Sequence, residues 1–171
     1  KLANNTFRDV SFAFANELAK LAEEHNVNAF DLVRAANEGY VRNKLSLPSP
    51  GVGGYCLTKD PFLYHASLND FKEKTSFGML SRKVNNEAMD YPIRVLKGFS
   101  KFIKKPLDEM KILLIGMAFK GNPETNDLRG SISIDMLNKL IPLTCSVHIF
   151  DWVIEKRELE KIHPLVLTKL Q

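Results

Sequence analysis

The stretch Lys111-Ile112-Leu113-Leu114-Ile115-Gly116 decides the fold class of the second half of the chain. A continuous aliphatic run that ends at a glycine is typical of a fully buried parallel strand. A helical pattern follows over 131–140, a second apolar run over 146–151 predicts another strand, and a helix is expected over 153–162. This β-loop-α-β order indicates a Rossmann-like α/β domain with a parallel sheet. Because one such unit cannot cover both faces of a parallel sheet, we expect a partial domain.

The first half of the chain has helical patterns. Apolar residues recur at helical spacing over 4–25 and again over 28–37. A loop rich in proline and glycine spans 43–60, and helix resumes after it. A longer helical stretch covers 76–104, where Pro92 is expected to kink or split the helix.

We therefore predict two domains, a mainly α-helical domain over 1–106 and a partial α/β domain over 107–171. Of the 171 residues, 44% are hydrophobic and 26% charged, which excludes a disordered chain, a collagen and a disulfide scaffold. The longest apolar run, 112–119, is far shorter than the roughly 20 residues of a bilayer span. A net charge of +4 is too mild to indicate a nucleic-acid or membrane partner.

The two cysteines and the first residue of the chain suggest where the protein is located and whether the sequence is complete. Two cysteines in this length are typical of free thiols in a reducing compartment, so we expect a cytoplasmic protein. The chain begins at Lys1 without a methionine, so we expect a fragment of a larger protein.

The loop Gly51-Val52-Gly53-Gly54-Tyr55-Cys56-Leu57-Thr58-Lys59-Asp60-Pro61 carries the strongest chemical signal. Its glycines allow backbone amides to approach a ligand closely, and a helix begins just after them. The positive end of that helix and the Lys59 charge both favour the thiolate form of Cys56. Asp60 is placed to accept or relay a proton, so the spacing predicts a cysteine nucleophile. The alternative is a structural cysteine at a turn into a helix.

A second candidate site follows the strand at 111–116. Gly116-Met117-Ala118-Phe119-Lys120-Gly121 and Arg129-Gly130-Ser131 combine backbone amides, a helix start and two cations, which suits a phosphate or pyrophosphate. A plain βα turn is the alternative, because these residues form neither a Gly-x-Gly-x-x-Gly nor a Walker A pattern. Asp151 ends the next strand, where dinucleotide-binding folds place a ribose-binding carboxylate.

Other polar and titratable residues carry weaker signals. Lys1 and Asn5 share a helix face, but such pairs are common on solvated helices. The four histidines show no paired spacing with cysteine or acidic residues, so no metal site is expected. Cys145 stands at the start of an apolar strand and is expected in the core.

Together these motifs resemble the nucleotide-sugar 6-dehydrogenases, the family that contains UDP-glucose and UDP-N-acetylmannosamine dehydrogenases. The nucleophile loop of that family reads Gly-Gly-x-Cys-x-Pro-Lys-Asp and corresponds to residues 53–60. Its central domain opens with Lys-x-x-x-Asn-x-Phe, found here as Lys1, Asn5 and Phe7. Its third domain opens with a strand, then Gly-x-Ala-Phe-Lys and Asp-x-Arg-x-Ser, which match 116–120 and 127–131.

The resemblance implies an NAD-dependent double oxidation of a UDP-sugar at C6, through a thiohemiacetal and a thioester on Cys56. It implies that Asp60 acts on water as a base or orienting group, and that Lys1 and Asn5 stabilise the oxyanion. It also implies a homodimer built by the central helical domain, in which Arg42 reaches the sugar of the partner subunit. By the same resemblance, NAD is contacted by Lys59 and Arg129, and the nucleotide sugar by Ser49, Gly53, Phe119 and Lys120, besides Arg42.

The chain departs from the family pattern at two positions. Thr58 stands where the family has proline, which bears on the rigidity of the loop. Gly130 stands where many members have glutamate, and the spacing over 120–129 is longer than in UDP-glucose enzymes. The longer spacing favours UDP-N-acetyl-D-mannosamine or a related UDP-N-acetylhexosamine as substrate.

The chain also lacks the NAD domain that opens these enzymes, so we expect the fragment alone to be inactive. A non-catalytic module for dimerisation or nucleotide-sugar binding is the alternative function. An unrelated thiol hydrolase is a third class, which would need a histidine near Cys56.

Overall fold

Small and polar side chains form the buried face of the longest helix, α1 (Leu2–Glu24), in this computed structural model. Asp9 and Ala13 are buried, whereas Phe7 and Phe14 are 70% and 52% exposed. The helix predicted here is confirmed. Phe7 and Phe14, however, do not face the core of this chain.

The structure describes residues 1–68, 75–144 and 146–167, and the chain divides into two compact units, Lys1–Asp90 and Tyr91–Gln171. The two units divide between Asp90 and Tyr91. The sequence places the domain boundary later, after residue 106, and that boundary stays a prediction. Cys145, expected in the core, lies outside the described residues.

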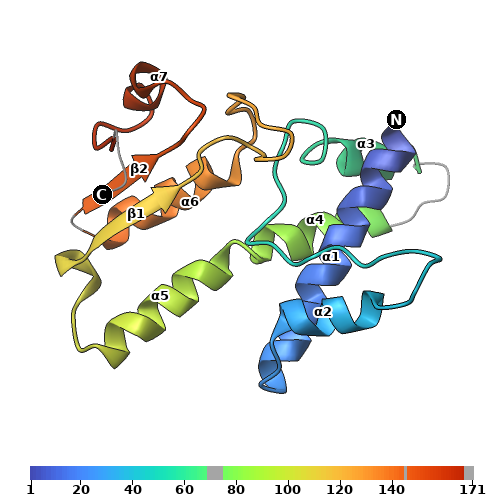
Figure 1. Ribbon diagram of the computed structural model, residues 1–171. Helices are drawn as coiled ribbons and strands as arrows, with labels where there is room; N and C mark the ends of the chain where they lie inside the picture. The colour runs from blue at the N-terminus through green and yellow to red at the C-terminus, as the bar shows by residue number, and fades with distance from the viewer. Residues whose placement is uncertain (69–74, 145, 168–171) are drawn as a thin grey trace. The chain divides into compact units, whose positions relative to one another are not determined.

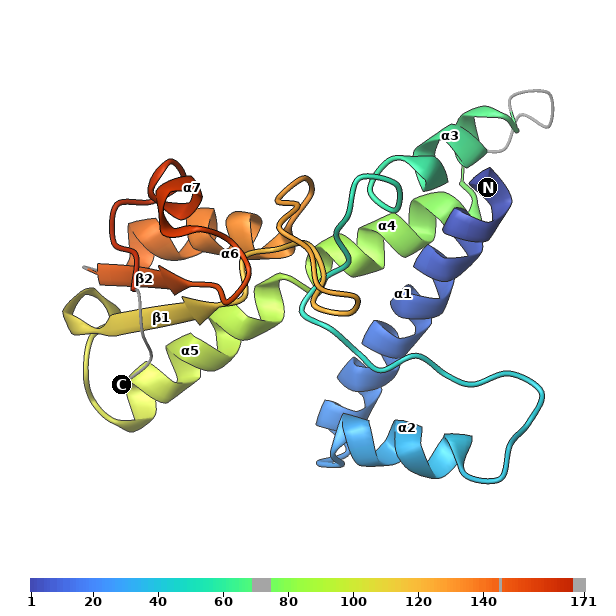
Figure 2. The same cartoon turned by 45° about the horizontal axis from the view of Figure 1, so that its top comes forward.

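Helices build the described part of the first unit. α1 packs against α2 (Ala29–Asn37), α3 (Asp60–Ala66) and α4 (Phe77–Glu87). Figures 1 and 2 show α2 and α3 near opposite ends of α1, and the long loop between them returns past α1. That loop carries the glycines and the cysteine of the candidate site to the end of α1 where the chain begins.

Local signals set where these helices begin and end. The Asn28 side chain accepts backbone N–H groups of the first turn of α2 and caps it. Gly39, with a φ of 67°, follows the end of α2. The stretch 76–104 is split, as predicted, into α4 and α5 (Asp90–Phe102). Pro92 lies in the first turn of α5, where its missing N–H removes no helical hydrogen bond.

The second unit contains a parallel pair of strands, β1 (Lys111–Ile115) and β2 (Ser146–Phe150), joined through α6 (Ile132–Leu140). Shorter elements complete its described part: η2 (Leu107–Glu109), η3 (Ile141–Leu143) and α7 (Lys156–Glu160). The predicted β-loop-α-β order is confirmed. The fold class is therefore a mainly α-helical chain with a small parallel sheet.

β1 is not the fully buried strand that its aliphatic run predicts. Leu113 and Ile115 are 38% and 47% exposed and alternate with half-buried neighbours. The other face of the sheet is covered, because Leu114 pairs with the fully buried Ile149 and α6 runs along one side of the sheet (Figures 1 and 2). The expectation was wrong because a single helix covers a single face of a two-stranded sheet.

A third extended segment, which the sequence did not signal, adds to β2. Ile149 bridges Val166 in parallel, and its N–H donates to the carbonyl of Leu165 at 2.9 Å. The N–H of Leu167 donates to the carbonyl of Ile149 at 2.9 Å. β2 thus has neighbours on both edges, as in the start of a doubly wound sheet.

The helix predicted over 153–162 is shorter than expected, because α7 begins only at Lys156. The Asp151 Oδ1 atom accepts the N–H groups of Val153 and Ile154 at 2.8 and 3.1 Å. This turn takes up the first N–H groups that a longer helix would order. Within the described ranges, no helix combines the length and the apolar character needed to cross a bilayer.

Candidate active site

The loop ahead of α3, residues 51–59, presents Cys56 as an exposed free thiol. We call it the cysteine loop. Gly51 and Gly54 adopt φ angles of 128° and 91°, which residues with a side chain rarely adopt. At Gly51 an added Cβ would also lie 2.6 Å from Met89 Cγ. The carbonyl of Cys56 accepts the N–H of Asp60 at 2.9 Å, so the thiol residue is tied to the start of α3.

Asp60 is buried, and its two carboxylate oxygens have separate partners. The Asn5 Nδ2 atom donates to Oδ2 at 2.6 Å, and the Lys59 Nζ atom donates to Oδ1 at 2.5 Å. Asn5 comes from α1, 55 positions away in the chain. The structure therefore brings Asn5, Lys59 and Asp60 together at the start of α3, which follows Cys56 in the chain.

These contacts shift the protonation equilibria of the pair. The hydrogen bonds from Lys59 and then Asn5 hold the pKa of Asp60 below its ordinary value, although burial opposes the shift. In return, the hydrogen bond to Asp60 raises the pKa of Lys59. The Lys59 Nζ atom also lies 5.4 Å from the centroid of the Tyr55 ring, a cation–π distance. At neutral pH the site holds a carboxylate and an ammonium group.

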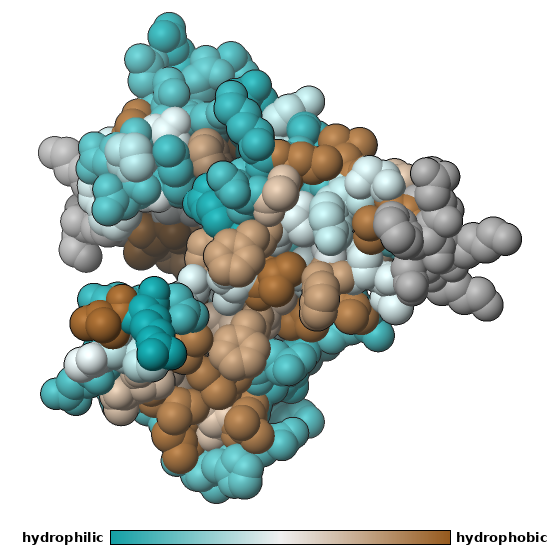
Figure 3. All heavy atoms as spheres, turned by 90° about the vertical axis from the view of Figure 1, so that its right-hand side faces the viewer, coloured by the Kyte–Doolittle hydropathy of each residue, from teal (hydrophilic) through white to brown (hydrophobic). Residues whose placement is uncertain are grey.

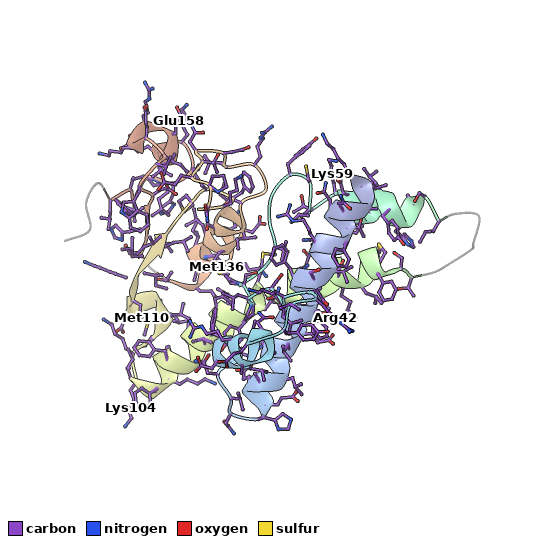
Figure 4. The ribbon with its side chains drawn as sticks, turned by 45° about the vertical axis from the view of Figure 1, so that its right-hand side comes forward. Arg42, Lys59, Lys104, Met110, Met136 and Glu158 are labelled. Carbon is purple, nitrogen blue, oxygen red and sulfur yellow. The ribbon has the colours of Figure 1, made fainter. Side chains whose placement is uncertain are left out.

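Three other residues of the first unit that the sequence singles out have different surroundings. Lys1 is exposed, one helical turn before Asn5, whose N–H donates to the Lys1 carbonyl at 2.9 Å. Gly53 is half-buried within the cysteine loop. Arg42 is exposed on the loop after α2, and Figure 4 shows it well apart from Lys59 within this unit.

The second candidate site lies in the turn between β1 and α6. The N–H of Phe119 donates to the Asp127 carbonyl at 3.0 Å, and the exposed Lys120 has its Nζ 5.4 Å from the Phe119 ring centroid. The Arg129 guanidinium grips the Asp127 carboxylate at 2.7–3.2 Å. These hydrogen bonds lower the pKa of Asp127 to about 2. Phe119, Lys120 and Arg129 thus belong to one ordered turn.

Two hydroxyls close this turn onto the start of α6. The Ser131 Oγ atom donates to the Met117 carbonyl at 2.7 Å and accepts the N–H of Ser133 as the N-cap of α6. The Ser133 hydroxyl donates to the Gly116 carbonyl at 2.5 Å. The predicted helix start at Ser131 is confirmed.

The carboxylate of Asp151 accepts four backbone hydrogen bonds, and the ribose-binding role suggested by its position stays a prediction. Its oxygens accept the N–H groups of Met117 and Ala118 at 2.7 and 3.2 Å, in addition to those of Val153 and Ile154. Burial opposes ionisation of Asp151, but these four donors outweigh it and lower the pKa of its carboxyl. The side chain joins the ends of β1 and β2.

A buried polar network between α1 and α4 was missed by sequence reasoning. The Asp9 carboxylate accepts hydrogen bonds from Ser81 Oγ at 2.6 Å and from Arg82 NH1 at 2.7 Å. The Asn85 amide donates to Asp9 Oδ1 at 2.9 Å. All four residues are buried. Charged and amide side chains at helical spacing are also normal on solvated faces, so the sequence carries no signal that separates the two cases.

The network continues to the cysteine loop through Asn16. Its Nδ2 atom donates to Asn85 Oδ1 at 2.9 Å, and its Oδ1 atom accepts the N–H of Ser49 at 2.8 Å. The Ser49 hydroxyl donates to the Gly51 carbonyl at 2.7 Å. Ser49, singled out as a substrate contact, therefore also orders the start of the loop.

The side chains singled out for ligand binding include the exposed cations Lys59 and Arg129. Within 1–68, 75–144 and 146–167, no cluster of three or more His, Cys, Asp or Glu side chains is arranged to hold a metal ion. Lys59 and Arg129 have side chains 43% and 73% exposed, so both cations are open to an anionic ligand.

The chain is similar in sequence to known nucleotide-sugar dehydrogenases. The family model described as the central domain of the UDP-glucose/GDP-mannose dehydrogenase family matches residues 1–87. UDP-N-acetyl-D-mannosamine dehydrogenase from Methanocaldococcus jannaschii is 34% identical over 151 residues, which are 88% of this chain and 33% of that protein. The enzyme of the same name from Campylobacter jejuni is 37% identical over 142 residues, 82% of this chain and 32% of that protein. The chain spans about a third of the length of these curated relatives.

Solved structures agree with the sequence matches. The structure of UDP-D-ManNAc dehydrogenase from Pyrococcus horikoshii aligns with a TM-score of 0.80 at 30% identity, covering 100% of this chain and 37% of that chain. UDP-N-acetyl-mannosamine dehydrogenase Cap5O from Staphylococcus aureus aligns with a TM-score of 0.71 at 30% identity, covering 91% of this chain and 35% of that chain. The first of these alignments extends over both units.

Proposed function

Because the chain belongs to the UDP-glucose/GDP-mannose dehydrogenase family, we propose that it is part of an NAD-dependent UDP-sugar 6-dehydrogenase. The proposed reaction oxidises the C6 alcohol of the sugar to a uronate. One observation carries the proposal: an exposed cysteine on a glycine-rich loop lies three residues before the Lys59–Asp60 ion pair, which α1 also holds through Asn5. The names of the relatives support a nucleotide-sugar dehydrogenase.

The proposed substrate is UDP-N-acetyl-D-mannosamine or a related UDP-N-acetylhexosamine. Relatives named for UDP-N-acetyl-D-mannosamine and for NDP-N-acetyl-D-galactosaminuronic acid are 34% identical to this chain. The long spacing between Lys120 and Arg129, as the family resemblance interprets it, supports the same branch. Phe119 and Lys120 in the second unit, and Ser49 and Gly53 in the first, are the proposed contacts of the nucleotide sugar.

In the proposed mechanism the Cys56 thiolate attacks the C6 aldehyde of the half-oxidised sugar and forms a thiohemiacetal. The second oxidation yields a thioester, and water releases the uronate and restores the thiol. The exposure of Cys56 supports this role, because an attacking sulfur must be reachable by a bound sugar.

Asp60 is suited to orient the hydrolytic water more than to deprotonate it. Its lowered pKa makes it a weak base at neutral pH, whereas its carboxylate is a fixed acceptor. The Asn5 amide donates one N–H to Asp60 and retains a second for an oxyanion at C6. Lys1, one turn earlier on α1, would add a positive charge to the same oxyanion.

NAD would accept the hydride in each oxidation. The fit of this chain to the cofactor rests on Lys59 and Arg129, the exposed cations proposed to bind its pyrophosphate. Each is held by a neighbouring carboxylate, Asp60 and Asp127 respectively, which limits the rotamers of a long side chain before the anion binds.

We also propose that the protein forms a homodimer through its helical part. Phe7, Phe14 and Leu21 are 70%, 52% and 49% exposed and recur every seven residues, so they lie along one face of α1. Figure 3 views the side of the molecule that carries α1 and α2 in Figure 1 and shows apolar side chains gathered into a patch. A second copy would cover such a patch, and Arg42 would reach the sugar bound to that copy.

Cys56→Ser, made in the protein as its gene encodes it, tests the catalytic proposal. With UDP-N-acetyl-D-mannosamine and NAD, we expect uronate formation to fall more than about a hundredfold, because the covalent step is lost. Cys145→Ser is the thiol control and should keep its activity. A Cys56→Ser protein with undiminished uronate formation would refute the cysteine mechanism. No uronate formation by the unaltered protein would instead favour the non-catalytic binding module.

Light scattering tests the dimer. Phe14→Lys should shift the protein toward monomer, because it places a charge on the exposed face of α1. Phe102→Glu is the matched change, since Phe102 is 83% exposed on α5 in the second unit. If only Phe102→Glu lost the dimer, the dimer interface would lie on α5 and not on α1, and the proposed interface would be wrong.

A further inference from the structure

Arg82 is a buried cation on α4 whose hydrogen bonds reach the cysteine loop. Its side chain is 5% exposed, and its NH1 atom donates to Asp9 Oδ1 at 2.7 Å. The same nitrogen donates to the carbonyl of Val52 at 3.2 Å and to that of Leu57 at 3.4 Å. The NH2 atom donates to Asn86 Oδ1 at 2.6 Å, which fixes the plane of the guanidinium group.

Val52 and Leu57 bracket the segment that carries the thiol. Both side chains are buried, and the four residues between them, 53–56, end in Cys56. This segment contains two glycines, and glycine has the greatest backbone freedom of any residue. The Arg82 NH1 atom hydrogen-bonds the carbonyl of Val52 before this segment and the carbonyl of Leu57 after it. These two hydrogen bonds therefore constrain the distance between the two ends of the segment. The position of the sulfur depends on that distance.

We propose that Arg82 is a positioning residue for the Cys56 thiol. The guanidinium joins the two ends of the turn and holds the loop in the conformation that presents the sulfur to a bound sugar. This inference rests on the proposed function, in which Cys56 is the nucleophile. The ion pair with Asp9 compensates the buried positive charge of Arg82. The two hydrogen bonds to the carbonyls of Val52 and Leu57 hold the cysteine loop in place.

Arg82→Lys, in the protein as its gene encodes it, separates these two tasks. Lysine keeps the charge beside Asp9 but lacks the planar fork that holds carbonyls as well. With UDP-N-acetyl-D-mannosamine and NAD, we expect kcat to fall about 10- to 100-fold while KM for the sugar stays within about threefold. Amide exchange over 53–58, followed by mass spectrometry, should be at least about tenfold faster.

Two further variants separate positioning from stability. Ser81→Ala removes the 2.6 Å hydrogen bond to Asp9 but leaves the carbonyl hydrogen bonds of Arg82 in place. It should lower stability without changing kcat or amide exchange in the loop. Asn86→Ala, at an exposed position, removes the acceptor that orients NH2. It should lower kcat about two- to fivefold with a near-native fold.

The proposal is overturned by an Arg82→Lys protein that folds and keeps both its kcat and the slow exchange of the loop. An equal loss of kcat in Ser81→Ala would overturn it too, because a general loss of stability would then explain the effect. Where Arg82→Lys does not fold, unchanged kcat and exchange in Asn86→Ala count against it. Full activity of Cys56→Ser would instead refute the nucleophile role of Cys56 in the proposed function, and loop exchange would still report whether Arg82 holds the loop.

Discussion

Asp9→Asn tests whether the buried ion pair with Arg82 stabilises the first unit. Asp9 is fully buried, and its carboxylate accepts hydrogen bonds from Arg82 at 2.7 Å and from Ser81 at 2.6 Å. Asparagine has nearly the same shape, and its amide can donate to the Ser81 hydroxyl in return. The substitution therefore removes the negative charge and leaves the Arg82 cation buried.

The size of the effect follows from that uncompensated charge. Breaking a buried ion pair by removing one partner costs about 3–5 kcal/mol of the free energy of unfolding. We expect the lower end, about 3 kcal/mol, because Arg82 keeps its carbonyl acceptors at Val52 and Leu57. A typical domain has a stability of about 5–15 kcal/mol, so the loss should be large against the total.

Urea unfolding followed by circular dichroism measures this loss. Asp31→Asn is the matched control, because Asp31 and Arg34 form a 3.2 Å pair with side chains 68% and 72% exposed. It should cost less than about 0.5 kcal/mol. A loss below about 1 kcal/mol for Asp9→Asn would refute the reasoning. The double variant Asp9→Leu with Arg82→Met should be more stable than Asp9→Asn, because no unpaired charge is left.

Gly51→Ala should lower the free energy of unfolding by about 2–4 kcal/mol, because φ is 128° and the new Cβ would lie 2.6 Å from a methionine side chain. Gly39→Ala, with a φ of 67° and nothing within 4 Å, should cost only about 1 kcal/mol in the same urea assay. In a ¹³C NMR titration, Asp127 should show a pKa of about 2, against an ordinary value of 3.8. Its contribution to stability should be complete above pH 3.8 and be lost as the pH falls through about 2, and Arg129→Gln should bring the pKa back toward 3.8. Asn28→Ala should cost about 1 kcal/mol in thermal unfolding, because α2 loses its N-cap acceptor, and an unchanged midpoint would contradict this.

Much of the order of helices and strands could be predicted, because caps and breakers act within a few residues. Asn28, Gly39 and Pro92 mark element ends that the structure confirms. The burial of each face could not be predicted in the same way. Periodicity indicates that α1 has an apolar side, but Phe14 on that side is exposed while the carboxylate of Asp9 is buried.

Sheet features depended on partners far away in the chain. Leu113 and Ile115 read as core residues, yet their exposure is set by whether a second layer covers that face of β1. Val166 reads as an ordinary apolar residue, and its bridge to Ile149 exists because β2 offers a free edge.

In the candidate site, too, residues close together in the sequence could be predicted, whereas contacts between distant residues could not. Cys56, Lys59 and Asp60 lie within five consecutive residues, so their proximity follows from sequence alone. The family resemblance singles out Asn5, and the fold brings its side chain to Asp60 from 55 positions away. Arg82 had no such signal, because nothing local distinguishes a buried arginine from one on a solvated helix face.

The two faces of α1 can be understood together. Asn5 holds the carboxylate that follows the cysteine loop, and Asp9 balances the Arg82 charge that ties both ends of the turn. Asn16 binds the N–H of Ser49 at the start of the loop. Because these tasks need short polar side chains that allow close approach, the inward face of α1 has little room for a large apolar one. The bulky side chains Phe7 and Phe14 are left to the outward face, where the proposed dimer would bury them. On this reasoning the polar residues on the inward face of α1 and the large apolar residues on its outward face are linked through the anchoring of the cysteine loop by this helix.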